Sequence, residues 1–266
     1  MKKKFKLNSS TLLVFILTTG VFGIINTEMG VIGILPLIAE NFQVTVPEAG
    51  WTVSIFALVV AISAPITPLL FSGINRKKVM ILALGLFTLS NIISMMTTNF
   101  TVLLISRALP AFLHPVYVSM AFTVAAASVS KEKAPKAVAK VFIGVSAGMV
   151  LGVPVTSYIA SEVSYSMGML FFTVVNALVL VATILFVPSM PVKEKLSYGT
   201  QLSVLKKKVV WYSILTITLI NGALFGFFSY MSDYLKTITG VSYTVISTML
   251  LIYGLANIIG NVIAGK

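Results

Sequence analysis

Eight long apolar stretches are the feature that most restricts what this chain can fold into. They lie near 11–38, 49–71, 79–98, 101–128, 139–160, 167–188, 209–235 and 243–264. Each has about the length that an α-helix needs to cross the hydrocarbon core of a bilayer. Only 10% of the residues are charged, whereas soluble domains carry about 25%, so the chain lacks the polar surface to cover itself in water. The sequence therefore predicts an all-α polytopic membrane protein and excludes a soluble enzyme or a disordered chain.

The basic residues predict how the chain is oriented in the membrane. Alternate connectors hold 17 of the 19 lysines and arginines: Lys2, Lys3, Lys4, Lys6, Arg76, Lys77, Lys78, Lys131, Lys133, Lys136, Lys140, Lys193, Lys195, Lys206, Lys207, Lys208 and Lys266. The other connectors hold Glu40, Glu48 and Glu162, with Lys236 as their cation. Because cytoplasmic loops are enriched in basic residues, we expect both termini in the cytoplasm and a multi-pass protein of the cell membrane. The lysines do not alternate with stacking aromatics, so the predicted partner is the lipid bilayer and not nucleic acid.

One connector is longer than the others and suggests a domain boundary. Residues 189–208 follow the sixth apolar stretch and are opened by Pro188 and Pro191. We therefore predict an N-terminal six-helix bundle over 1–188 and a cytoplasmic linker over 189–208. Residues 209–266 would form two helices of a second, incomplete bundle.

Glu28 is an acidic residue past the middle of the first apolar stretch. A charge at that depth costs about 3 kcal/mol, and burial favours the protonated carboxyl group. Glu28 is therefore a candidate proton carrier, or a counter-ion for a cationic substrate. The alternative is a structural carboxylate satisfied by Asn26, Thr27 or a neighbouring helix.

Arg107 and His114 lie in the fourth apolar stretch. Arg107 stays protonated and needs an anion or several carbonyl groups nearby, unless it extends outward to the membrane surface. His114 is seven residues further on and would return to nearly the same helix face. A single histidine of this kind is more often a packing residue than a proton relay.

The sequence offers no catalytic or metal-binding set. It has one histidine and no cysteine, and it lacks a nucleophile elbow and a phosphate-cradling loop. We therefore predict no enzyme activity, no cofactor and no metal site. An ion gradient would be the energy source for any coupled transport.

Four sequence motifs resemble those of the major facilitator superfamily, and in particular its bacterial drug/proton antiporter branch. Residues 27–39 read TEMGVIGILPLIA, similar to the branch pattern T-E-x-x-x-x-G-L-L-P-x-I-A. Arg107 stands in a fourth-helix motif, and residues 260–266 resemble the loop motif of the second half. The fifth stretch resembles the antiporter motif through four residues: Gly144, Gly148, Gly152 and Pro154.

The loop after the second apolar stretch departs from the family pattern. It contains Gly73, Asn75 and Arg76, and many family members have an aspartate where Asn75 stands. The resemblance implies a cytoplasmic gate loop, in which Asn75 would have to act through hydrogen bonds. Pro115, beside His114, replaces the glycine that relatives usually have.

The resemblance implies proton-coupled efflux of a small organic solute or drug by alternating access. It places Asn26, Glu28, Arg107 and His114 at the cavity where protons and substrate would exchange. Because family members have about twelve spans, we expect a fragment that lacks its last four. The alternatives are a sugar or nucleoside uniporter or importer, for which Asn26, Asn91, Asn176 and Asn221 would be candidate ligands, and a non-transporting membrane fragment.

Overall fold

The computed structural model describes residues 9–192 and 206–264, of which Ser9 and 257–264 are described by their backbone only. The predicted linker 189–208 therefore lies mostly outside the described residues. The same holds for several of the basic residues that predict orientation: Lys2, Lys3, Lys4, Lys6, Lys193, Lys195 and Lys266.

The described residues form helices and no strand, which confirms the predicted fold class. The elements are α1 (Ser9–Met29), the 3₁₀ turn η1 (Gly30–Ile34), α2 (Leu35–Phe42), α3 (Val46–Ala49), α4 (Trp51–Ser63), α5 (Thr67–Leu70), α6 (Arg76–Met96), α7 (Phe100–Ala111), α8 (His114–Ala127), η2 (Lys131–Lys133), α9 (Ala134–Glu162), α10 (Tyr165–Phe186), α12 (Lys208–Thr239) and α13 (Tyr243–Ala264). Seven helical runs among the described residues are long and apolar enough to cross a membrane. They correspond to the first seven predicted stretches, and α13 corresponds to the eighth.

Proline residues divide two of these runs into shorter helices. Because proline lacks an amide hydrogen and restricts the residue before it, it fits best in a first helical turn and often ends or bends a helix elsewhere, although α9 continues past Pro154. In the second apolar stretch, the long helix α4 ends at Ser63, before Pro65. The short helix α5 follows and has Pro68 in its first turn. The fourth run ends α7 one residue after Pro110 and begins α8 at His114, followed by Pro115. His114 is thus the first residue of a new helix.

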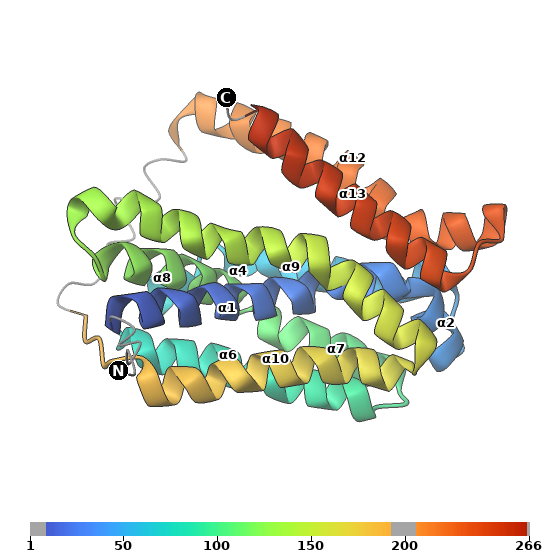
Figure 1. The fold of residues 1–266 in the computed structure, drawn as a ribbon, viewed down its shortest axis with the longest axis horizontal. Coiled ribbons are helices and arrows are strands. Elements are labelled where there is room, and N and C mark those ends of the chain that lie inside the picture. Colours follow the sequence, from blue (N-terminus) through green and yellow to red (C-terminus); the bar gives the residue numbers. More distant parts are fainter. Residues whose placement is uncertain (1–8, 193–205, 265–266) are drawn as a thin grey trace, which may run out of the picture.

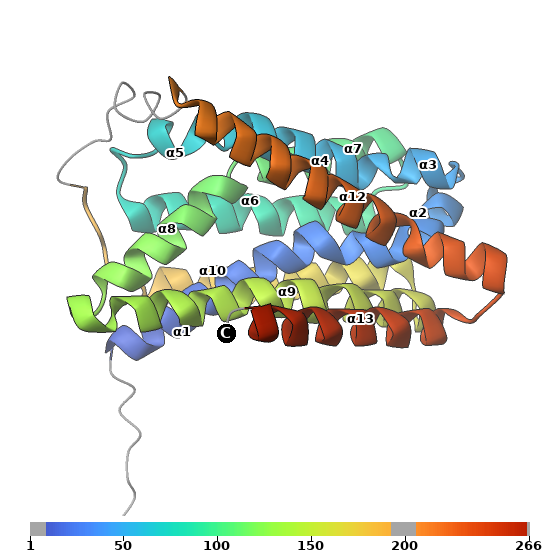
Figure 2. The ribbon, with the colours of Figure 1, turned by 90° about the horizontal axis from the view of Figure 1, so that it is seen from above.

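The first six runs form one bundle, with α1 between α9 and α10 (Figure 1). Helix α13 lies beside α9 in both views (Figure 2), while α12 contacts η1 and α2. The two last helices approach the bundle at the end where α2 lies and stand away from it at the other end. Accordingly, α12 buries residues only in its second half, namely Phe228, Ser229 and Ser232.

The glycines of α9 allow it to pack closely against α1. A Cβ atom at Gly144 would collide with the carbonyl oxygen of Thr18, and one at Gly148 would lie 2.8 Å from Cβ of Ile25. At Gly152 the same atom would be 2.5 Å from Oδ1 of Asn26. Small residues one turn apart are a common means of close helix packing in membranes. Three of the four residues of the predicted antiporter motif therefore form a helix interface, and the fourth, Pro154, is buried further along α9.

This interface leads to a testable expectation. We expect Gly144→Ala to lower the free energy of unfolding by about 1–3 kcal/mol, because the new methyl group meets backbone that must shift. Gly85→Ala in α6 is the matched control, since a Cβ atom there would have nothing within 4 Å. Thermal unfolding in detergent measures both variants. Equal stability of the two would contradict the close α1–α9 contact.

Candidate functional site

Glu28 and His114 come together in the interior of the bundle. Oε2 of Glu28, in the last turn of α1, is 3.1 Å from Nε2 of His114, at the start of α8. The two side chains are 17% and 12% exposed, respectively. The contact is at ion-pair distance, although neither ring nitrogen meets the angular requirement for a hydrogen bond. The pair joins a partly buried carboxyl group to the only histidine of the chain.

Arg107 binds the backbone that carries Glu28. Its Nη1 donates to the carbonyl oxygen of Thr27 at 2.6 Å and its Nη2 to that of Glu28 at 3.1 Å. Its Nε donates to the carbonyl oxygen of Thr52 in α4 at 3.2 Å. Arg107 is only 2% exposed, so it does not extend to the membrane surface. Of the two readings of this residue, the structure shows the one in which carbonyl groups satisfy the guanidinium group.

The bond pattern has a local cause at the end of α1. The α-helix stops at Met29 and continues as the 3₁₀ turn η1 from Gly30. Carbonyl groups at such a transition can accept hydrogen bonds from outside the helix. Arg107, in α7, supplies the donors. The guanidinium group is therefore fixed to the helix end and not paired with the carboxylate of Glu28.

Phe56 of α4 links Arg107 and His114 and was not foreseen from the sequence. The Arg107 guanidinium carbon lies 5.0 Å from the centre of the Phe56 ring, a cation–π distance. The same ring meets the His114 ring edge-on, with centroids 5.8 Å apart. Phe56 is 1% exposed. A phenylalanine in an apolar stretch carries no signal that would set it apart, because its role depends on which helix faces it.

A polar cluster around Thr27 adjoins the site. Its hydroxyl group donates to the carbonyl oxygen of Gly23 at 2.9 Å and accepts from Nδ2 of Asn91 at 3.2 Å and of Asn176 at 2.9 Å. These side chains join α1, α6 and α10 inside the apolar bundle. The sequence signal is their polarity within apolar stretches, but it indicates the asparagines only as ligands for the alternative sugar or nucleoside carrier, and the bond network is not predicted.

Asn26 points away from this site, toward α9. Its Oδ1 lies against Gly152, and neither atom of its amide group has a hydrogen-bond partner among the described residues. It is fully buried. Neither Asn26 nor Thr27 binds the Glu28 carboxylate in the structure; the contact of that group is His114.

The predicted gate-loop residues form a second, separate group at the end of the bundle where α6 begins. Asn75 caps α6 by accepting from the amide of Lys77 at 3.0 Å, and its Nδ2 donates to Ser189 at 2.8 Å. The amide of Arg76 donates to the carbonyl oxygen of Met190 at 3.1 Å. Gly73 lies in an exposed turn before them. Hydrogen bonds thus connect this loop to the segment that follows α10.

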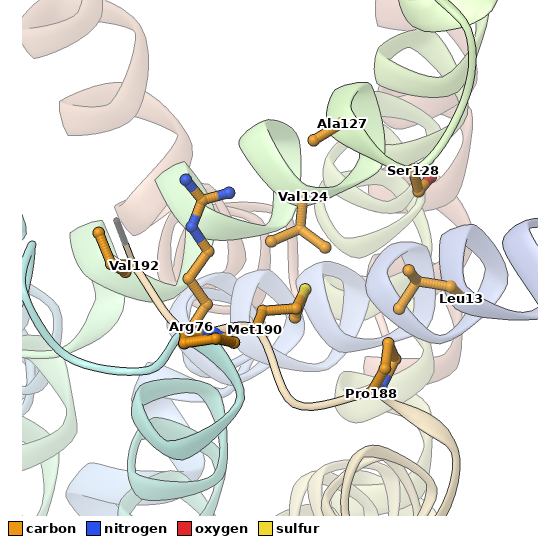
Figure 3. Close-up of a pocket in the computed structure, with 9 residues that line it drawn as sticks. Leu13, Arg76, Val124, Ala127, Ser128, Pro188, Met190 and Val192 are labelled. Carbon is orange, nitrogen blue, oxygen red and sulfur yellow. The ribbon is translucent and has the colours of Figure 1, made fainter. Parts of the chain in front are cut away.

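A cavity of about 640 Å³ lies beside this loop. Figure 3 shows the Arg76 side chain at the cavity with Met190 and Val124, and Leu13 and Pro188 on its other side. The lining is apolar apart from Arg76 and Ser128. Among the described residues, no group of three or more histidine, cysteine, aspartate or glutamate side chains is placed to bind a metal ion.

Comparison with known proteins identifies the family. The sequence pattern of the Major Facilitator Superfamily matches residues 12–266. The inner membrane transport protein YdhP of Escherichia coli strain K12 is 31% identical over 250 residues, which are 94% of this chain and 64% of that protein. The uncharacterized MFS-type transporter YtbD of Bacillus subtilis strain 168 is 32% identical over 256 residues, which are 94% of this chain and 63% of that protein. The chain thus spans somewhat less than two thirds of these relatives.

Solved structures show the same fold at lower sequence identity. A bacterial homologue of the human lysosomal transporter Spinster, in an inward-facing and unoccupied conformation, matches with a TM-score of 0.72 and 16% identity over 94% of this chain and 59% of that one. The human organic anion transporter MFSD10 matches with a TM-score of 0.65 and 16% identity over 92% and 70% of the two chains. Sequence and fold together establish that this chain belongs to the Major Facilitator Superfamily.

Proposed function

We propose that the protein to which these residues belong is a proton-coupled efflux transporter of a small organic solute or drug, working by alternating access. The observation that carries the proposal is the contact between Glu28 and His114, 3.1 Å apart in the bundle interior. Ionisable residues within membrane spans are costly and commonly mark a proton or substrate path. Both side chains can carry a proton, and they lie close enough to attract each other when they are oppositely charged.

The pair has the properties that proton coupling requires. Histidine is the side chain whose charge changes nearest to neutral pH, and a carboxylate beside it can hold the proton in its place. When Glu28 is protonated, it no longer offers a negative charge to a cationic or polar substrate. Proton and substrate therefore compete for the same group, and this competition yields exchange. Transport would then proceed by rocking of two helix bundles around a central site, as in other secondary transporters built from repeats.

Arg107 serves in this proposal as a positioning residue. Its guanidinium group binds the carbonyl groups of Thr27 and Glu28, so it fixes the backbone from which the Glu28 side chain projects. Its charge also lies near the carboxylate while its donors are used elsewhere. The protonation of Glu28 can then change without breaking the bonds that hold α1 to α7.

The arrangement of α12 and α13 supports an inward-facing state for the proposed cycle. The two helices pack on the bundle through a cluster that includes Ile32, Val153, Phe228, Ile246 and Leu250. This cluster lies toward the end of the bundle that the charge pattern predicts to be extracellular. The first half of α12, toward the predicted cytoplasmic end, is exposed. The similar solved structure named above is also inward-facing.

The contacts of the asparagines argue against a sugar or nucleoside carrier. A sugar site needs amide groups that face a cavity, but Asn91 and Asn176 donate to Thr27 inside the first bundle. The amide of Asn221 donates to the carbonyl oxygen of Ile217 in its own helix. An apolar or amphipathic solute therefore fits better than a carbohydrate. A non-transporting fragment remains the other alternative, and the transport assay below separates the two.

The Glu28 carboxylate can be tested by an isosteric change. We expect Glu28→Gln to abolish efflux driven by a pH gradient, because the amide cannot take up and release a proton. Efflux of a fluorescent amphipathic cation from everted vesicles measures this, with membrane insertion checked by immunoblot. Glu40→Gln, an exposed carboxylate at the end of α2, is the matched control and should leave efflux intact.

Three results would count against this assignment. Normal pH-driven efflux in Glu28→Gln would show that the proton is carried elsewhere. An absence of efflux in the unaltered chain, with insertion intact, would favour the non-transporting fragment. Equal losses in both glutamine variants would indicate a general effect of surface charge.

The positioning role of Arg107 leads to a stability prediction. We expect Arg107→Met to lower the free energy of unfolding by about 2 kcal/mol, since buried carbonyl groups lose charged donors. Lys78→Met, which removes an exposed charge from the first turn of α6, should change it little. Thermal unfolding in detergent compares them. In Arg107→Lys, one ammonium group cannot replace three separate bonds, so an intermediate stability is expected.

A further inference from the structure

A second cavity, separate from Glu28 and from the gate loop, is lined by lysines. It has a volume of about 400 Å³ and lies where α1 and α9 begin. Its polar lining consists of Lys133, Lys136, Lys140, Ser10 and Thr11. We refer to this cavity and these five residues as the lysine pocket. The carbonyl oxygen of Lys140 accepts a hydrogen bond of 3.2 Å from Thr18, which ties the two helices together at its inner edge.

The charge of the lysine pocket is not neutralised by the described residues. The single ion pair among them is the one between Glu28 and His114. Glu132 is the acidic residue next in sequence, and its carboxylate is hydrogen-bonded to Ser130. Lys136 and Lys140 are four residues apart and so share one side of α9, and Lys133 is the residue immediately before this helix. Like charges at this spacing repel each other unless an anion lies between them.

The hydroxyl groups of Ser10 and Thr11 complete the donor set of the lysine pocket. Three ammonium groups and two hydroxyl groups around one cavity offer several hydrogen-bond donors to the oxygens of a single anion. A phosphate group, with its several acceptor oxygens and its negative charge, matches such a set. The first turns of α9 add the positive end of the helix dipole.

The rest of the cavity and its surroundings are apolar. Val14 and Ala137 line its floor. Ile143, at a spacing of seven residues from Lys136, continues the same face of α9 and is 61% exposed. The face therefore passes from charged to apolar along the helix, from the end of a span into its hydrocarbon-crossing part. A ligand with a phosphate at one end and an alkyl chain at the other would satisfy both parts.

We propose that the lysine pocket binds the phosphate headgroup of an anionic phospholipid, with the acyl chains running along α9 past Ile143. Basic residues at the membrane surface attract anionic lipids, and basic pockets between helices hold their headgroups. Occupation would neutralise the three lysines and stabilise the contact between the ends of α1 and α9. The site does not depend on the proposed transport activity.

The test compares phospholipid retention by the purified full chain and by a variant without the lysines. The chain is exchanged into detergent with equal amounts of phosphatidylglycerol and phosphatidylcholine, and native mass spectrometry counts the bound lipids. We expect a preference for phosphatidylglycerol that falls about tenfold in K133Q/K136Q/K140Q. The matched control K206Q/K207Q/K208Q removes the same charge from the start of α12 and should keep the preference within about twofold.

Other outcomes would overturn the proposal. An unchanged preference for phosphatidylglycerol in the pocket variant, or an equal loss of that preference in the control variant, would mean that the lipid binds to the net charge of the chain and not to this pocket. Inorganic phosphate is added in a separate arm. Occupation by phosphate without a preference for phosphatidylglycerol would mean that the ligand is the free ion and not a lipid. If the triple variant does not fold, the single variants K133Q, K136Q and K140Q replace it, each with an expected loss of about threefold.

Discussion

The first helical run crosses the middle of the bundle, where the hydrocarbon of a membrane offers no hydrogen-bonding partner. Its polar groups therefore depend on partners within the protein, and several of these partners come from other helices. Arg107 takes up the carbonyl groups at the end of α1, and Asn91 and Asn176 meet the hydroxyl group of Thr27. The carboxylate of Glu28 meets His114. These contacts and the glycine face of α9 join α1 to α6, α7, α8, α9 and α10.

Under the proposed function, the same constraint separates structural groups from proton-carrying groups in this helix. Thr27 and the carbonyl groups at the end of α1 are bound by amide and guanidinium donors, whose protonation does not change. Glu28, in contrast, has a partner that can itself gain or lose a proton, and both side chains keep some exposure. Asn26 differs again, because its amide is buried against Gly152 and has no hydrogen-bond partner within the described part of the chain. A rigid scaffold thus surrounds one group whose charge can change.

Much of the fold was predictable from the sequence, because a membrane span needs only length and apolar composition. The breaks after Ser63 and Ala111 lie next to Pro65 and Pro110, in keeping with the effect of proline on a helix. The candidate residues Glu28 and Arg107 stood out for the same reason, since charge is rare in such stretches. The relation between them was not predictable, because it depends on how helices that are distant in sequence face one another.

The sequence by itself determined the class of protein, the approximate spans and the residues whose burial would need a reason. Its charge pattern and its linker remain predictions about orientation and domain boundaries. Only the tertiary structure decided the partners: Arg107 binds carbonyl groups and not an acid, and His114 contacts Glu28 from the first turn of a restarted helix. Periodicity fixes which residues share a face of one helix. Which faces meet is decided by packing, here by the glycines that draw α9 against α1.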